Sequence, residues 1–313
     1  DKTPYRAVWP KNFKMRFETS LRLLGIRVPV MEAPASPELP YAVTTKVFVY
    51  PGQPFFDLET TLHGKPADPF PEAGWMVLPV KADAPQFRLG RLGSIIDPVK
   101  DVVRGANRNL FGINTGLTIT DADGRGLAIC PLDSPLVSLD EPGCWKYSRD
   151  FIPKKPIAYI NLFNNQWTTN FRLWNSGTWT SRVRIWVTDR NDPSRTFTQP
   201  ALEARFPLQA AVSKREGGKL PPTQAGLELS RQDVLVSAFG PSNTGHGILL
   251  RLWELAGRSG DCQVRLPAGL NIKTAQPIDL RGQVKGSPIK VQNGRFSFDL
   301  SAFAPASFAL AAE

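Results

Sequence analysis

The sequence predicts an all-β protein built from short strands. Its 313 residues include 25 Gly and 29 Pro, which interrupt long helices because Pro lacks an N–H donor and Gly has a high entropic cost of ordering. Hydrophobic residues make up 42% of the chain, enough apolar material for a packed core rather than a disordered polymer. Many short segments alternate apolar and polar residues with a period of two, which is typical of strands.

The first elements follow in order along the chain. Residues 1–40 are predicted to be an extended, Pro-rich lead-in with one short helix over residues 12–24. Alternating or apolar runs then predict strands at residues 43–49, 56–62, 75–80, 157–162 and 182–187. Between them, residues 117–120 and 127–129 flank Asp123-Gly124 and predict a hairpin, because Asp-Gly favours the positive φ angles of a tight turn. Trp186, on the last of these strands, is expected in the core.

The second part of the chain continues the same pattern at closer spacing. Strands are predicted at residues 227–229, 234–239, 247–255, 262–266, 272–274, 278–280, 295–300 and 307–310. Regularly spaced short strands favour a sandwich. We divide the chain into a lead-in (1–40), a large β domain (41–215) and a C-terminal β domain (216–313), with the Gly- and Pro-rich residues 202–226 as the boundary region.

Charge and hydropathy narrow the range of partners. The net charge of +10 is spread over the whole chain, whereas a nucleic-acid-binding surface concentrates its basic residues, so no nucleic-acid partner is expected. No apolar run is long enough to span a bilayer, so no membrane partner is expected either. The chain begins Asp1-Lys2-Thr3-Pro4, without an initiator Met or a signal-peptide core, which indicates a processed protein or a piece of a longer one. Localisation stays open, with export to the periplasm or the exterior as one alternative.

Cysteine and histidine offer little for metal chemistry. Cys130, Cys144 and Cys262 lack metal-ligand spacing, and we interpret them mainly as small buried side chains, with a Cys130–Cys144 bridge as the alternative. The chain has only two histidines, His63 and His246, far apart in sequence. A zinc site within this chain is therefore not expected.

The densest functional signal is a run of carboxamides and indoles at residues 161–174. Carboxamides donate and accept hydrogen bonds as sugar hydroxyls require, and an indole offers a flat apolar face to the C–H groups of a pyranose. We predict carbohydrate-binding residues from this run together with one loop histidine: Asn164, Asn165, Gln166, Trp167, Asn170, Trp174 and His246. The alternative, Trp in the core and Asn in turns, is equally compatible with the run. His246 alone is more typical of a solvated loop.

Three acids could in principle supply a catalytic carboxylate pair. Asp133, Asp140 and Glu141 lie close in sequence beside Pro and Gly. Glycoside hydrolysis needs two carboxyl groups held about 5–10 Å apart, but acids in this context more often stabilise turns. We interpret them as turn residues and leave the catalytic residues unknown.

One segment resembles a known family. Residues 247–258, GILLRLWELAGR, are similar to the G-x-x-L-R-L-[aromatic]-E-x-x-G strand in the C-terminal β domains of glycoside hydrolase family 38 α-mannosidases. Residues 264–266, 275–280, 296–303 and 307–310 follow in an order that resembles the closing strands of that region. Residues 87–90 and 112–130 resemble its large sandwich more loosely, so that the resemblance spans residues 40–313.

The resemblance implies a galactose-mutarotase-like supersandwich followed by a smaller β-sandwich domain. It also implies a zinc-bearing N-terminal α/β barrel that carries the nucleophile, and nothing in this sequence matches that barrel. We therefore expect an accessory, carbohydrate-facing region of an α-mannosidase-like enzyme, not catalytic by itself, with a separate or removed catalytic domain as a partner and zinc only in that domain. Two alternatives remain: a stand-alone carbohydrate-binding or mutarotase-like protein, and a structural interaction domain.

Overall fold

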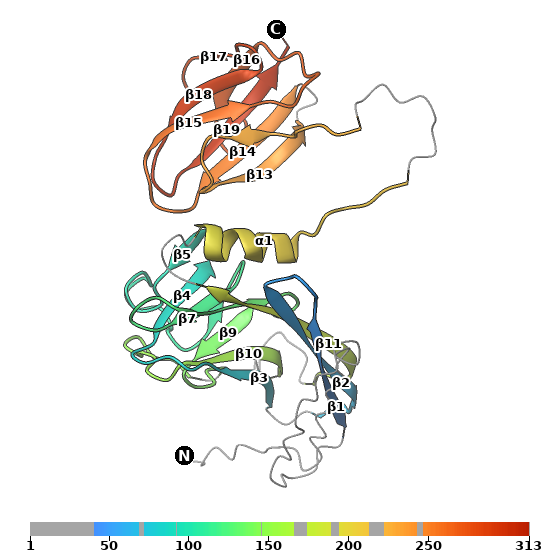
Figure 1. The fold of residues 1–313 in the computed structure, drawn as a ribbon. Helices are drawn as coiled ribbons and strands as arrows, with labels where there is room; N and C mark the ends of the chain where they lie inside the picture. Colours follow the sequence, from blue (N-terminus) through green and yellow to red (C-terminus); the bar gives the residue numbers. More distant parts are fainter. Residues whose placement is uncertain are drawn as a thin grey trace. The chain divides into compact units, whose positions relative to one another are not determined.

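The protein is described by a computed structural model that covers residues 41–68, 72–91, 93–144, 146–165, 174–188, 194–212, 222–242 and 247–312. The predicted lead-in and its helix over residues 12–24 lie outside these residues. The described chain forms two compact units that meet in sequence at Phe206 and Pro207, within the 202–226 region. Residues 93–95 group by contacts with the second unit, although Ser94 and Ile95 belong to a strand that pairs in the large sheet of the first. Each unit is built almost entirely of strands (Figure 1), which confirms the all-β, β-sandwich prediction.

The first unit contains a large sheet and a small one. The large sheet has seven strands in the order β1-β2-β11-β8-β7-β4-β5, and the small one has four in the order β3-β10-β9-β6. The strands of the large sheet are β1 (Ala42–Val49), β2 (Phe55–Lys65), β4 (Gln86–Arg91), β5 (Ser94–Ile96), β7 (Leu117–Thr120), β8 (Gly126–Pro131) and β11 (Gly177–Thr188). Those of the small sheet are β3 (Ala73–Pro79), β6 (Phe111–Gly112), β9 (Leu136–Leu139) and β10 (Ile157–Asn164).

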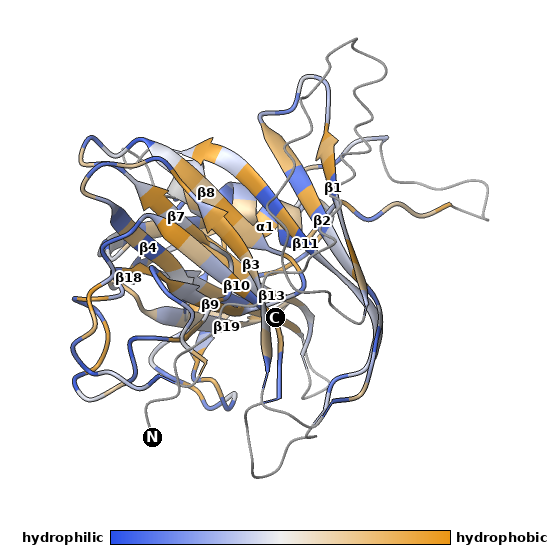
Figure 2. Cartoon of the chain, turned by 90° about the horizontal axis from the view of Figure 1, so that it is seen from below, coloured by the Kyte–Doolittle hydropathy of each residue, from blue (hydrophilic) through white to orange (hydrophobic). Residues whose placement is uncertain are grey.

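The two sheets enclose one hydrophobic core. Leu117, Ile129 and Val183 contribute from the large sheet, and Val137 and Ile160 contribute from the small one; all five are fully buried. Figure 2 shows hydrophobic residues concentrated along β3, β7, β8 and β10. The pairing of two sheets through their apolar faces is what makes this unit a sandwich.

The predicted hairpin is confirmed. Strands β7 and β8 pair antiparallel, with Thr120 opposite Gly126. In the turn, the Asp121 carboxylate accepts a hydrogen bond from the Arg125 N–H at 2.9 Å, and Gly124 has a φ of 86°. The Asp-Gly signal was therefore sufficient to locate this turn.

A short helical segment covers part of the outer face of the large sheet. It consists of a π-helical turn, η2 (Ser194–Thr198), and the helix α1 (Gln199–Arg205), which the sequence did not predict. The Trp186 indole donates a hydrogen bond to the Thr196 carbonyl at 2.8 Å, and Ala201 is fully buried. Trp186 is 6% exposed, so its expected burial is confirmed. Its neighbour Val187 is 78% exposed.

The second unit is a smaller sandwich of two sheets. A three-stranded sheet has the order β12-β15-β18, and a five-stranded sheet has the order β13-β14-β19-β16-β17. Their bounds are β12 (Glu228–Leu229), β13 (Val234–Pro241), β14 (Ile248–Glu254), β15 (Gly260–Arg265), β16 (Thr274–Ile278), β17 (Ile289–Lys290), β18 (Arg295–Leu300) and β19 (Pro305–Ala311). Val264 and Phe296 of one sheet share a core with Leu250 and Leu310 of the other.

The strands predicted over residues 272–280 differ from those in the structure. In place of the two strands expected at residues 272–274 and 278–280, the structure has a single strand, β16, whose second residue Ala275 is fully buried opposite Leu310. Leu280 is 62% exposed and lies outside any strand.

No disulfide links the three cysteines, which are all free thiols. Cys130 and Cys262 are buried, and Cys144 is half-buried. Among the described helices, none is long and apolar enough to cross a membrane.

Candidate functional site

Three of the seven predicted carbohydrate-binding residues lie on either side of residues 166–173, a segment that the structure does not describe. Asn164 ends strand β10, Asn165 follows it, and Trp174 precedes strand β11. Gln166, Trp167 and Asn170 fall within residues 166–173, and His246 within residues 243–246; these four lie outside the described residues. Asn164, Asn165 and Trp174 form the two described flanks of this segment.

Asn165 joins the end of β10 to the chain that precedes β3. Its carboxamide oxygen accepts a hydrogen bond from the Glu72 N–H at 2.6 Å, and its amide group donates to the Asp68 carbonyl at 3.0 Å. The side chain is buried, with only 4% of the residue exposed. Both ends of this carboxamide are thus used to satisfy backbone groups, which is a structural role.

Only the amide group of the Asn164 side chain is hydrogen-bonded. Its amide group donates to the Asn161 side-chain oxygen at 2.7 Å, and its backbone carbonyl accepts from the Asn175 amide at 3.0 Å. The side-chain oxygen of Asn164 is buried and has no hydrogen-bond partner among the described residues. A buried acceptor of this kind is costly to leave unpaired, so Asn164 retains a hydrogen-bonding capacity at this flank.

A buried lysine ties the two flanks together. The Lys65 side chain, 1% exposed, forms an ion pair with Glu72 and donates to the Asn175 carbonyl at 3.0 Å. Its ammonium group also lies 4.9 Å from the centre of the Phe163 ring, a cation–π contact. Burial, followed by the nearby Glu72 carboxylate, raises the pKa of Tyr41, whose ring lies 5.9 Å from the same ammonium group.

Trp174 is the flanking residue that is accessible from solvent. It is 45% exposed, whereas the neighbouring Trp179 packs edge-on against Phe163 with ring centres 5.7 Å apart. An exposed indole next to a rigid, buried network is a suitable stacking surface for an apolar ring face. This flank therefore combines a fixed scaffold with one available aromatic face and one unpaired amide oxygen.

The three acids considered as catalytic candidates all have structural partners. Asp133 forms two hydrogen bonds with the Arg182 guanidinium, at 2.8 and 3.0 Å, and these lower its pKa below the usual value. The Asp140 carboxylate accepts from the Lys154 N–H at 2.9 Å, and Glu141 pairs with Lys146 at 2.8 Å. These contacts are compatible with their interpretation as turn residues.

The described residues do not fit a zinc site. His63 shares a hydrogen bond with the Thr44 hydroxyl at 3.0 Å on the exposed edge of the large sheet. Within the described ranges, no group of three or more His, Cys, Asp or Glu side chains is placed to hold a metal ion. No step of a reaction is therefore assigned to a metal held by these residues.

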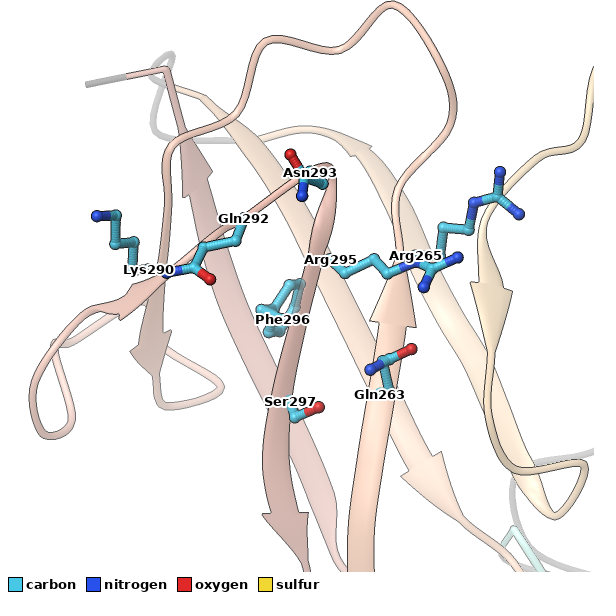
Figure 3. Close-up of a pocket in the computed structure, with 8 residues that line it drawn as sticks. All are labelled: Gln263, Arg265, Lys290, Gln292, Asn293, Arg295, Phe296 and Ser297. Carbon is cyan, nitrogen blue, oxygen red and sulfur yellow. The ribbon is translucent and has the colours of Figure 1, made fainter.

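The second unit contains a polar groove that sequence reasoning missed. Its volume is about 490 Å³, and Figure 3 shows its lining: Gln263, Arg265, Lys290, Gln292, Asn293, Arg295, Phe296 and Ser297. Strands β15 and β18 form its floor, where Arg265 lies directly opposite Arg295 and Gln263 opposite Ser297. The available signal was the alternation of polar residues on both strands, but only the strand register brings them together.

Part of the second unit matches a known protein family. Residues 233–304 match the glycosyl hydrolases family 38 C-terminal beta sandwich domain. The chain resembles the C-terminal β-sandwich region of that family. The resemblance inferred from residues 247–258 is thereby confirmed.

Two solved structures share the fold of the larger part of this chain. One is a protein of glycosyl hydrolase family 38 from Enterococcus faecalis, with a TM-score of 0.64, 14% identity, and coverage of 88% of this chain and 31% of that one. The other is an alpha-mannosidase from Enterococcus faecalis V583, with a TM-score of 0.62, 15% identity, and coverage of 88% and 30%. The chain thus spans about a third of their length. No curated protein matches the sequence.

Proposed function

We propose that this chain is the accessory, carbohydrate-facing β region of an α-mannosidase-like glycoside hydrolase whose catalytic barrel lies outside it. The observation that carries the proposal is the combined match: residues 233–304 fit the family 38 C-terminal domain, and the fold aligns with only 30% of an alpha-mannosidase chain. The remainder of such a chain has no counterpart in the aligned part of this one. In the proposal, that remainder supplies the zinc site and the catalytic carboxylates.

Two features support an accessory role over catalysis by these residues alone. The described acids that could form a catalytic pair are engaged with Arg182, Lys146 and a backbone amide. The described histidine, His63, is bonded to a threonine rather than grouped with other potential ligands. The contribution proposed for this chain is to present a sugar-binding edge and to support the enzyme structurally.

The sugar-facing edge is assigned to the β10–β11 flank. Trp174 offers an exposed indole, and the intervening sequence adds Gln166, Trp167 and Asn170. On the other flank, Asn164 has a buried carboxamide oxygen with no partner among the described residues. The ion pair between Lys65 and Glu72 fixes the position of both flanks. It involves neither the Trp174 indole nor the Asn164 carboxamide oxygen.

Binding is tested by calorimetric titration of the 313-residue chain with mannose and short α-mannosides. Trp174→Ala is expected to weaken binding about tenfold, the effect of losing a stacked aromatic face with its buried area. Phe206→Ala, which removes another exposed aromatic side chain (72% exposed), serves as the matched control and is expected to bind as the parent chain does. Equal affinities for all three proteins would contradict the assignment of this edge.

Catalysis is tested separately with p-nitrophenyl α-mannoside. The chain alone, with zinc supplied, is expected to show no turnover above the background rate. Turnover that depends on zinc and on this chain alone would overturn the accessory role. A folded chain that neither hydrolyses nor binds any mannoside would favour a structural interaction domain. The hydrogen bonds of Asn165 and Lys65 to backbone groups would then have a purely structural role.

A further inference from the structure

The groove of the second unit carries an inference that does not depend on the proposed function. Strands β15 and β18 pair so that Arg265 faces Arg295 and Gln263 faces Ser297. Their neighbours Val264 and Phe296 point into the core, at 0% and 4% exposure. Because side chains alternate along a strand, these two arginines, the glutamine and the serine all lie on the outer face of the sheet.

Two guanidinium groups directly opposite each other are unfavourable. Cross-strand partners have Cβ atoms only about 5 Å apart, and like charges in this position destabilise a sheet. Glu228 on β12 relieves one of them, since its carboxylate accepts from Arg265 at 3.0 Å. Arg295 has no ion pair among the residues that the structure describes. This end of the sheet therefore carries an uncompensated positive charge.

Nearby acids do not neutralise that charge. Asp261 and Asp299 form the corresponding like-charged pair on the same face, but four positions further along the same two strands. At about 3.3 Å per residue they are about 13 Å away, beyond the screening length of about 8 Å at physiological salt. Lys290 adds a third cation to the groove, and in Figure 3 Gln292 lies between Lys290 and the two arginines.

The remaining lining residues are suited to a polar ligand. Gln263, Gln292, Asn293 and Ser297 supply amide and hydroxyl groups beside the arginines, and these groups both donate and accept hydrogen bonds. Arginine binds oxyanions through paired N–H donors. A volume of about 490 Å³ is within the range of small-ligand sites, which run from about 300 to 1,000 Å³.

We propose that this groove binds the oxyanion of a small phosphate or sulfate ester of a polyhydroxylated compound. The Arg265–Arg295 pair holds the oxyanion. The carboxamides and the serine contact the neighbouring hydroxyl groups. An oxyanion placed between the two guanidinium groups also removes their mutual repulsion, so binding and sheet stability are linked.

The experiment is a calorimetric titration of the full chain with four probes: inorganic phosphate, sulfate, the phosphate of a hexose other than mannose, and that free hexose. Phosphate, sulfate or both should bind, the hexose phosphate should bind more tightly than inorganic phosphate, and the free hexose should not respond. The relative affinities of phosphate and sulfate distinguish the two ester classes. Raising the salt concentration should weaken binding because the contact is ionic.

Arg295→Gln is the deciding variant, with Arg258→Gln as its matched control. Both arginines are exposed, and Arg258 precedes β15 at the opposite end of the strand from Arg265. Loss of a charge-assisted hydrogen bond should weaken hexose phosphate binding by about tenfold or more in Arg295→Gln and leave Arg258→Gln unchanged. Thermal unfolding should also show that phosphate raises the melting temperature of the parent chain but not that of Arg295→Gln.

Three outcomes would overturn the proposal. The first is the absence of binding by every anionic probe to a chain shown to be folded. The second is equal binding of hexose phosphate by the parent chain, Arg295→Gln and Arg265→Gln. The third is equal binding of the free hexose and its phosphate, which would mean that the oxyanion is not recognised. Mannoside binding at the β10–β11 flank is measured with other probes and variants, so the two proposals can fail separately.

Discussion

At the scale of single residues, Glu254 explains why the family-like segment 247–258 has a glutamate after its aromatic residue. Its carboxylate is 0% exposed and accepts four backbone N–H groups, from Ala256, Gly257, Arg258 and Phe303, at 2.7 to 3.1 Å. Arg231 completes the set at 3.1 Å. One side chain thereby fixes the turn after β14 and the chain that leads into β19.

Glu254→Gln is expected to lower the free energy of unfolding by about 3–5 kcal/mol. The amide group places N–H donors against backbone N–H groups and removes one of the two carboxylates that pair with Arg231, the other being Asp233. Urea unfolding followed by tryptophan fluorescence measures the loss. Glu228→Gln, which removes a half-exposed partner of Arg265 (54% and 44% exposed side chains), should change it by less than about 1 kcal/mol; similar losses for both variants would contradict this role.

Asp233 gives the second unit a predictable response to acid. Two hydrogen bonds from Arg231, at 2.9 and 3.2 Å, hold the pKa of the Asp233 carboxyl below its ordinary value. A carboxyl whose pKa is lower when folded stabilises the protein above its unfolded pKa of about 3.9, and this contribution is lost as the pH falls through the folded value. Asp233→Asn should therefore be less stable than the parent chain at pH 7.

The pH dependence is the part of this prediction that a purely structural role of Asp233 would not reproduce. The stability difference between Asp233→Asn and the parent chain should shrink as the pH falls below about 4, because the parent then protonates the same group. Urea midpoints measured from pH 7 to pH 3 test this. A difference that stays constant over that range would show that the carboxylate charge is unimportant.

At the scale of elements, the β7–β8 hairpin depends on close backbone contact as well as on its turn. A Cβ atom at Gly126 would lie 2.0 Å from the Ile119 carbonyl oxygen, which is part of the paired strand. Gly126→Ala should destabilise the first unit by about 1–3 kcal/mol or more, since backbone has to move to make room. Gly112→Ala on β6, where a Cβ meets nothing within 4 Å, should be close to neutral. Thermal unfolding of both variants provides the comparison.

Elements that are recognisable from local pattern were predicted, and those defined by distant partners were not. The alternation at residues 43–49 and 56–62 anticipated β1 and β2, which pair with each other over the whole length of β1. Strands β6 and β17 are only two residues long, too short to show a period. The bounds of β16 follow from its pairing with β19, where Ala275 meets Leu310, and no local signal marks that register.

In both candidate sites, too, the contacts depend on partners that are distant in sequence. The carboxamide run was visible in the sequence, but Asn165 is used by backbone groups of residues 68 and 72, which lie more than ninety positions earlier. Arg265 and Arg295 are thirty positions apart, and their direct opposition depends on the β15–β18 register. The residue types of both sites were therefore present in the sequence, while their partners required the fold.

At the scale of the whole chain, two separate cores indicate two units that can fold on their own. Among the described residues, the core of the second unit draws on hydrophobic residues between Leu227 and Leu310, and that of the first on hydrophobic residues between Phe56 and Ile185. A fragment of residues 207–313 should therefore unfold cooperatively in urea and give dispersed amide resonances. A fragment that starts at residue 256 lacks β12, β13 and β14 and should be unfolded. A disordered 207–313 fragment would contradict the independence of the second core.

The position of β11 in the large sheet has a consequence for synthesis on the ribosome. Strand β2 pairs with β1 on one edge and with β11 on the other, and β11 begins more than a hundred residues after β2 ends. At about 5–20 residues per second, the nascent chain carries one open β2 edge for roughly 5 to 25 seconds. An unpaired strand edge is a site of intermolecular association. Slow translation before residue 177 should therefore increase misassembly of this chain, whereas slow translation after residue 188 should not.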